Sequence, residues 1–160
     1  MRVALDVTPL VGHRTGIGLA VAEIVAAFAT LDPPPEIVPY ALSIRARRHH
    51  DELPPRTRYL PIPARVLLRT WGRSNFPSVD RWLGDCEVVH ATNYLAPPSK
   101  RPTVVSVYDC SFLHYPELCS SDVLRFAPAI RRAARRGAWI HTGSEFVAAE
   151  IREAFSTDLA

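Results

Sequence analysis

The first 44 residues decide the fold: "MRVALDVTPLVGHRTGIGLAVAEIVAAFATLDPPPEIVPYALSI" (residues 1–44). Residues 3–7 form a short apolar run, which predicts a strand. A loop with two glycines follows, and from Ile17 onward the apolar residues recur at helical spacing as far as Leu31. The sequence "DPPPE" ends this helix, because proline cannot continue a helix and biases the residue before it away from helical geometry. Residues 37–44 then predict a second strand.

The same alternation continues along the rest of the chain. Further strands are expected at residues 57–62, 87–91, 103–108 and 138–142, and short helices at residues 65–71 and 79–83. Strands that alternate with helices predict a parallel sheet with crossover helices on both faces. We therefore expect one α/β domain, a single Rossmann-like fold that spans residues 1–160.

Two helices are predicted near the end of the sequence, and the first is strongly amphipathic. Residues 122–136 place alanines and larger apolar residues on one arc and five arginines on the opposite arc. Pro128 would kink this helix or mark a late start. The last helix runs to about residue 155, and Thr142 and Glu145 have the spacing of a capping box at its beginning.

Composition narrows the class of protein. A net charge of +3 is too small to indicate a nucleic-acid partner. The longest apolar stretch is shorter than the roughly 20 residues of a membrane span, and the N-terminus lacks the cleavage site of a signal peptide. Three cysteines without a pairing pattern indicate reduced thiols. We therefore expect a cytoplasmic protein, in which the arginine-rich helix face is either solvated or a peripheral contact with anionic lipid.

Four loops of polar or glycine residues follow four of the predicted strands. In open parallel sheets, ligands bind outside the carboxyl ends of the strands, where such loops converge. A cleft is expected at that edge. Its candidate residues are Gly16, Ile17, Gly18, Asn93, Tyr108, Asp109, Ser144 and Glu145.

The glycine loop has the most direct physical interpretation. Gly16 and Gly18 flank Ile17 at the start of the first helix, where open backbone N–H groups and the helix dipole favour an anion such as a phosphate. The spacing departs from the G-x-G-x-x-G pattern of dinucleotide sites. A tight turn that lets the helix pack on the sheet is an equally good interpretation.

Tyr108 and Asp109 end the strand in "PTVVSVYDCSFLHYPE" (residues 102–117). An aspartate there either forms a turn or caps a helix, or it orients a substrate hydroxyl or a neighbouring loop. Tyrosine can donate or accept a hydrogen bond but is a poor general base at neutral pH.

The histidines and cysteines do not have the spacing of a metal site, so neither a metal nor another cofactor is expected. The sequence contains no Gly-x-Ser-x-Gly elbow and no Walker loop. A receiver domain is also disfavoured, because its acidic cluster and its lysine after the last strand have no counterpart here.

Taken together, the loops resemble the N-terminal domain of family 4 glycosyltransferases, the retaining enzymes of the GT-B fold. Four segments carry the resemblance, in order and with fitting spacing: "RTGIGLAVAEIVAAF", "VVHATNYLAPP", "PTVVSVYDCSFLHYPELCS" and "IHTGSEFVAAEI". The resemblance covers most of the chain, and four motifs in register are more specific than any one of them.

The resemblance implies an acceptor-side domain of an enzyme that transfers a sugar from a nucleotide-sugar donor to a glycan or lipid-linked acceptor. It assigns Gly16, Ile17 and Gly18 to the loop that approaches the donor phosphates. It makes Asp109 the aspartate of a His-Asp pair and places Ser144 and Glu145 in the cleft. The family's second domain, or a subunit in its place, would bind the donor, so residues 1–160 are expected to be incomplete and inactive alone.

Two departures from the family pattern bear on activity. Tyr108 stands where the family has a histidine that contacts the donor sugar, and Leu19-Ala20 replaces an Arg-Tyr pair after the glycine loop. The alternative is therefore a degenerate, non-catalytic module that binds a glycan or a protein.

Overall fold

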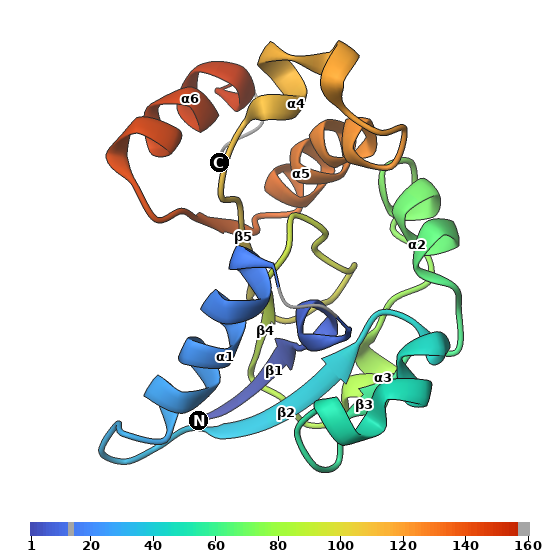
Figure 1. Ribbon diagram of the computed structural model, residues 1–160, viewed down its shortest axis with the longest axis vertical. Coiled ribbons are helices and arrows are strands. Elements are labelled where there is room, and N and C mark those ends of the chain that lie inside the picture. Colours follow the sequence, from blue (N-terminus) through green and yellow to red (C-terminus); the bar gives the residue numbers. More distant parts are fainter. Residues whose placement is uncertain (13–14, 157–160) are drawn as a thin grey trace.

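The computed structural model describes residues 1–12 and 15–156 and has an α/β architecture built on six parallel strands. The strand order is β3-β2-β1-β4-β5-β6, which is the order of the doubly wound Rossmann fold. The expected single Rossmann-like fold is confirmed. The strands are β1 (Arg2–Asp6), β2 (Glu36–Ala41), β3 (Arg58–Tyr59), β4 (Val88–Ala91), β5 (Thr103–Ser106) and β6 (Trp139–His141) (Figure 1).

One face of the sheet is covered by α1 (Gly16–Phe28) with the 3-10 turns at Thr8–Leu10 and Ile44–Glu52. Leu5 and Val7 pack there against Val21 of α1, and all three side chains are fully buried. The opposite face is covered by α2 (Ala64–Trp71), α3 (Asp80–Leu83) and α5 (Phe126–Arg135). The sheet is therefore a middle layer, which buries the apolar side chains of its central strands on both faces.

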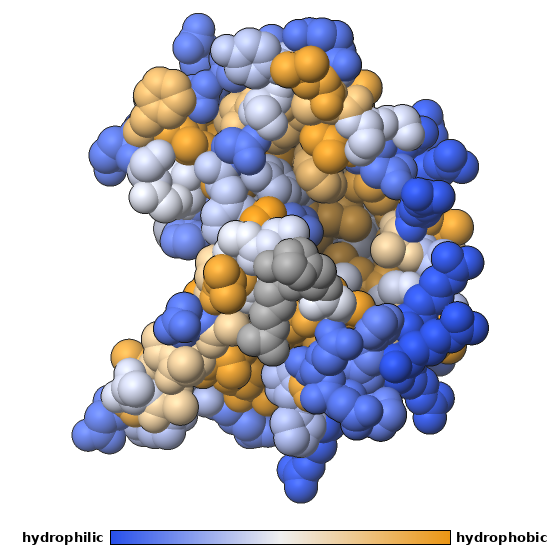
Figure 2. All heavy atoms as spheres, viewed as in Figure 1, coloured by the Kyte–Doolittle hydropathy of each residue, from blue (hydrophilic) through white to orange (hydrophobic). Residues whose placement is uncertain are grey.

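A third group of helices closes the carboxyl end of β5. It contains α4 (Ser111–His114), the short turns at Pro116–Leu118 and Val123–Arg125, and α6 (Glu145–Phe155). Val107, Phe112 and Ile130 join Val147, Ile151 and Phe155 in its core. Figure 1 shows α4, α5 and α6 gathered there, and Figure 2 shows a notch in the outline between α6 and α1.

The predicted bounds of one strand and the predicted starts of two helices were wrong. The strand expected at residues 57–62 contains only Arg58–Tyr59, at the outer edge of the sheet. Residues 122–136 form a 3-10 turn followed by α5, and Pro128 is the third residue of α5, where its missing N–H costs no helical hydrogen bond. Ser144, not Thr142, caps α6, because its Oγ accepts the Val147 N–H at 3.2 Å.

The arginine face of α5 is not an evenly solvated surface. Arg131 lies 5.5 Å from the centroid of the Phe155 ring, Arg132 donates to the Asn75 side chain at 3.0 Å, and Arg136 donates to the Ala96 carbonyl at 3.0 Å. These arginines hold α5 to its neighbours. Within the described ranges, no helix is long and apolar enough to cross a membrane.

The segments that follow the neighbouring strands β1 and β4 leave the sheet on opposite faces. The chain leaves β1 toward α1 on one face of the sheet, and it leaves β4 through Leu95 and Ala96, which pack on the other face. The Thr92 hydroxyl, fully buried, donates to the Asp6 carbonyl at 2.7 Å and joins the two strand ends. A doubly wound sheet forms its ligand crevice at such a reversal of strand order.

Replacing Thr92 with Val tests this link. The substitution keeps the shape of the side chain but leaves the buried Asp6 carbonyl without its donor, so the free energy of unfolding should fall by about 1–3 kcal/mol. The matched control is Thr103→Val at the opposite edge, whose Oγ1 donates to the nearby Arg101 carbonyl at 3.0 Å. Urea titration of both variants should show the larger loss for Thr92→Val; equal losses would contradict a special role for this bond.

Candidate functional site

The sequence-predicted loops lie at one edge of the sheet. Gly16 begins α1 after β1, Asn93 follows β4, Asp109 follows β5 and Ser144 follows β6. Because all six strands are parallel, their carboxyl ends share that edge. Among the described residues, one hollow at this edge contains Asn93 and another contains Asp109.

The first hollow lies at the divergence of β1 and β4, and we call it the switch-point pocket. Its volume is about 170 Å³. Asp6, Thr8 and Asn93 supply polar groups from the two strand ends. The wall is apolar, with aliphatic side chains from β2, α2 and the β4–β5 loop and one aromatic ring from α5: Leu42, Ala64, Leu68, Leu95 and Phe126.

Asp6 is the most unusual group in this pocket. It is 1% exposed, and one carboxylate oxygen, Oδ1, accepts both the Thr8 N–H, at 2.9 Å, and the Thr8 hydroxyl. Burial raises the pKa of Asp6 to about 6, although the Thr8 hydrogen bonds work in the opposite direction. A carboxyl group with such a pKa can exchange a proton near neutral pH or accept a substrate hydroxyl.

Asp6 was missed as a candidate from sequence. Its signal was the same as that of Asp109, a carboxylate at the end of an apolar strand. The mouth of the pocket carries one ion pair, between Arg65 Nε and Asp122 Oδ2 at 3.0 Å. The Arg65 side chain is 83% exposed, so this pair adds little stability and leaves the mouth free to adjust.

Asp109 is held by hydrogen bonds on both carboxylate oxygens. Its Oδ1 accepts the Ser111 N–H at 2.9 Å and the Ser111 hydroxyl at 2.6 Å, and its Oδ2 accepts the Tyr94 hydroxyl at 2.8 Å. Partial burial would raise the pKa of Asp109, but the bonds from Ser111 and Tyr94 outweigh it and hold the pKa below 3.8. Asp109 is therefore a poor general base, and it fixes the turn that starts α4.

Tyr94 joins the two hollows. Its ring stacks on Phe126 of the switch-point pocket, with centroids 4.7 Å apart, while its hydroxyl bonds to Asp109. Its edge-on neighbours are Tyr108 and Phe112, at 6.0 and 6.1 Å. Tyr94 adopts a φ of 56°, a conformation that bulky residues rarely adopt. Sequence reasoning missed Tyr94, although it lies inside a quoted motif.

The Tyr108 hydroxyl makes no hydrogen bond of normal geometry within the described part of the chain, although it is buried. The nearby Ser106 hydroxyl is bonded instead to His90 Nε2 at 2.9 Å and His141 Nδ1 at 3.1 Å. Burial raises the pKa of Tyr108. The hydroxyl is thus an unsatisfied donor at the carboxyl edge, next to the ring of Tyr94.

The glycine loop brings the start of α1 against this cluster. Ile17 packs with both the α1 core and the core around Tyr108, and Gly18 is buried between them. Gly16 is exposed, and the cap residue Thr15 makes no side-chain hydrogen bond to the first turn. Arg14, the arginine of the quoted motif, lies outside the described residues.

Ser144 and Glu145 lie at the N-terminus of α6 and stabilise the start of that helix. Ser144 uses its hydroxyl to cap α6, and Glu145 is exposed on the first turn of that helix. An acidic side chain there stabilises the positive end of the helix dipole. Among residues 1–12 and 15–156, no three histidine, cysteine, aspartate or glutamate side chains are placed to hold a metal ion.

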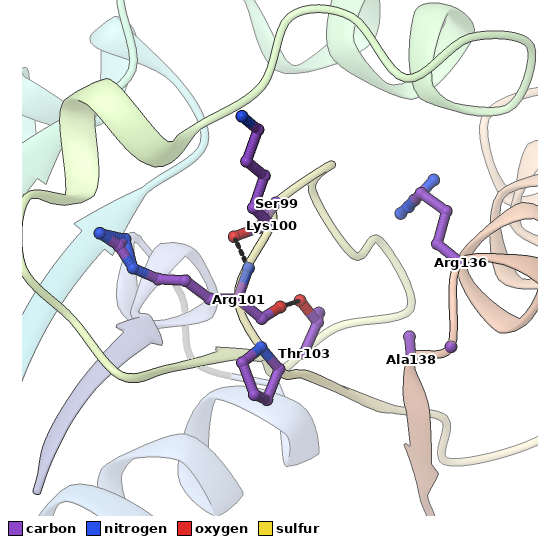
Figure 3. Close-up of a pocket in the computed structure, with 8 residues that line it drawn as sticks. Ser99, Lys100, Arg101, Thr103, Arg136 and Ala138 are labelled. Carbon is purple, nitrogen blue, oxygen red and sulfur yellow. Dashed lines mark hydrogen bonds between the residues drawn. The ribbon is translucent and has the colours of Figure 1, made fainter.

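Another cavity, of about 240 Å³, lies at the amino edge of β5 and β6, away from this site. Lys100 and Arg101 line it from one side and Arg136 from the other, but Lys100 and Arg101 direct their charged groups away from Arg136 (Figure 3). The Ser99 hydroxyl donates to the Asp80 carboxylate and accepts the Arg101 N–H, and the Thr103 hydroxyl donates to the Arg101 carbonyl. The cavity is basic, but its cations do not converge on one point.

Comparisons with protein-family models, curated proteins and solved structures returned no match to this chain.

Replacing Asp6 with Asn should stabilise the protein at neutral and alkaline pH. The folded pKa of Asp6, about 6, lies above the ordinary 3.8, so the stability that depends on its protonated form is complete below about pH 4 and is lost as pH rises through 6. The shift corresponds to about 3 kcal/mol. Asn keeps an acceptor for Thr8 and does not ionise.

In urea titrations, Asp6→Asn should therefore exceed wild type by up to about 3 kcal/mol above pH 7 and match it near pH 4. The exposed Asp85 provides the control substitution, Asp85→Asn. A gain in Asp6→Asn that is the same at every pH would show that burial of the charge is not its cause.

Proposed function

We propose that this chain is the acceptor-side domain of a retaining glycosyltransferase of the GT-B type, and that the complete enzyme uses a nucleotide-sugar donor. The observation that carries the proposal is the switch-point pocket, where the carboxylate of Asp6 and the amide of Asn93 face an apolar wall. A pyranose presents hydroxyls at its rim and C–H groups on its faces, so it complements both surfaces. The four motifs that resemble family 4 glycosyltransferases support the same assignment.

In the proposed reaction, an acceptor hydroxyl attacks the anomeric carbon of the donor as the bond to the donor phosphate breaks. The leaving nucleotide diphosphate takes the electron pair of that bond and the proton of the hydroxyl. Asp6 and Asn93 hold the acceptor by its hydroxyls. The first N–H groups of α1, at Gly16 and Ile17, face the donor phosphates and stabilise the charge of the leaving group.

Within this proposal, Asp109 and Tyr108 position the site and do not move protons. Asp109 already accepts three hydrogen bonds and has a low pKa, so it shapes the loop that joins β5 to α4. The proposal keeps the cytoplasmic location that the three free cysteines favour. A second domain, on the same chain or on a separate subunit, supplies the donor site.

One observation favours the second candidate, a degenerate module that binds a glycan without transferring a sugar. Among the residues that the structure describes, the buried Tyr108 hydroxyl makes no hydrogen bond of normal geometry, and both oxygens of Asp109 accept hydrogen bonds from neighbouring protein groups. The residue at the position of the family's sugar-contacting histidine, Tyr108, thus has its hydroxyl buried.

The complete gene product, assayed with radiolabelled UDP- and GDP-hexoses and a panel of sugar acceptors, should transfer sugar with retention of configuration. Asp6→Ala should lower kcat/KM for the acceptor by roughly 100-fold, because the acceptor loses its positioning group. The control is Asp85→Asn, at an exposed carboxylate outside the pocket. Absence of transfer with all common nucleotide sugars would reject the enzyme.

Substitution of Tyr108 separates the two candidates. A Tyr108→His variant that gains transfer activity over wild type would identify a decayed enzyme. A variant that loses activity, while Tyr108→Phe retains it, would show that the aromatic ring itself belongs to a working site.

A further inference from the structure

The second hollow of the carboxyl edge is a groove between α4 and α6. It has a volume of about 430 Å³, within the roughly 300–1,000 Å³ of small-molecule sites, whereas the switch-point pocket is smaller. The two helices lie side by side (Figure 1) and are joined by a contact between His114 Nε2 and Glu150 Oε1 at 2.5 Å. The groove is large enough for more than one sugar ring.

Two exposed aromatic rings line this groove, one from each side. Tyr115, at the end of α4, is 57% exposed, and Phe146, in the first turn of α6, is 73% exposed. Single exposed apolar side chains are ordinary on protein surfaces, but two that face one hollow indicate a binding surface. Rigid rings provide a large contact area at a low cost in conformational entropy.

The groove contains acidic and hydroxyl groups that accept hydrogen bonds from the hydroxyls of a ligand. Asp109 and Glu150 contribute carboxylates, and Ser111 contributes a hydroxyl. No lysine or arginine is among the residues that line the groove. Two carboxylates against one histidine, His114, leave the groove without a net positive charge, so it suits a neutral polyol that donates hydrogen bonds and does not attract an anion.

The groove is held in shape before any ligand binds. Asp109 fixes the start of α4 through Ser111, Ser144 caps α6, and Phe112 and Val147 are buried between the two helices. A preorganised surface avoids the entropy loss of ordering loops on binding.

We propose that the α4–α6 groove binds a neutral oligosaccharide, with pyranose faces on Tyr115 and Phe146 and hydroxyls on Asp109 and Glu150. This binding does not depend on transferase activity. If the proposed function also holds, groove binding implies that the acceptor is a glycan chain; this step rests on the proposed function. One sugar then occupies the switch-point pocket, and a neighbouring unit lies in the groove, because Tyr94 joins the two sites.

The test is a titration of the whole chain with maltotriose, cellotriose and mannotriose, followed in the heteronuclear NMR spectrum of the backbone amides. At least one trisaccharide should shift the amides of residues 109–115 and 146–150 with millimolar affinity. Phe146→Ala and Tyr115→Ala should each weaken that affinity by about threefold to tenfold. Phe76→Ala removes an equally exposed ring, 76% exposed, outside the groove and should leave the affinity unchanged.

Charge is tested with trigalacturonic acid, which should bind more weakly than the neutral trisaccharides at low salt. Glu150→Gln, which keeps an acceptor oxygen but removes the charge, should narrow that difference. Equal binding of the anionic sugar by the wild-type chain would overturn the assignment.

Three other outcomes would also overturn it: no shift with any trisaccharide, shifts that persist unchanged in both aromatic variants, or self-association that disappears in Phe146→Ala and so makes the groove a protein interface. The outcomes are separable from those of the transferase assay. Transfer to monosaccharides without groove binding would reject only the groove, and groove binding without transfer would reject only the enzyme.

Discussion

The hydrogen bond from the Thr92 hydroxyl to the Asp6 carbonyl, 2.7 Å long, is the constraint from which the rest of the site follows. It joins β1 and β4 at the point where the chain leaves the sheet on opposite faces. Closure of the strand ends there buries the Asp6 side chain under α2 and α5 and removes it from water. Burial raises the pKa of that carboxyl group, and the same geometry leaves a small pocket beside it.

The second organising contact is Tyr94, which turns two hollows into one edge. Its ring stacks on Phe126 in the wall of the switch-point pocket, and its hydroxyl donates to Asp109 in the groove. One side chain therefore contacts both hollows. The unusual backbone of Tyr94 is retained because three aromatic neighbours and a charged acceptor fix the side chain. These contacts lower the pKa of Asp109, whereas burial raises the pKa of Asp6.

The sequence was sufficient for the fold and for the edge that carries the loops, but not for the chemistry there. The stripe from Ile17 and the apolar runs before Asp109 and Asn93 depend on local periodicity, which a single sequence displays. The burial of Asp6 depends on helices more than fifty residues away in sequence, and the role of Tyr94 depends on a partner 15 residues away and on Phe126. The helix α4 was missed because four residues, Ser111–His114, are too few to show a period.

We propose that this protein binds its ligand at the carboxyl edge of the sheet and not at the amino edge. Crystals of the chain soaked in neutral sugars test it most directly, because a difference map locates a bound ring without prior assumption. We expect density in the α4–α6 groove or beside Asp6. Density confined to the basic cavity lined by Arg136, or a well-ordered lattice with both hollows open and no bound sugar, would contradict it.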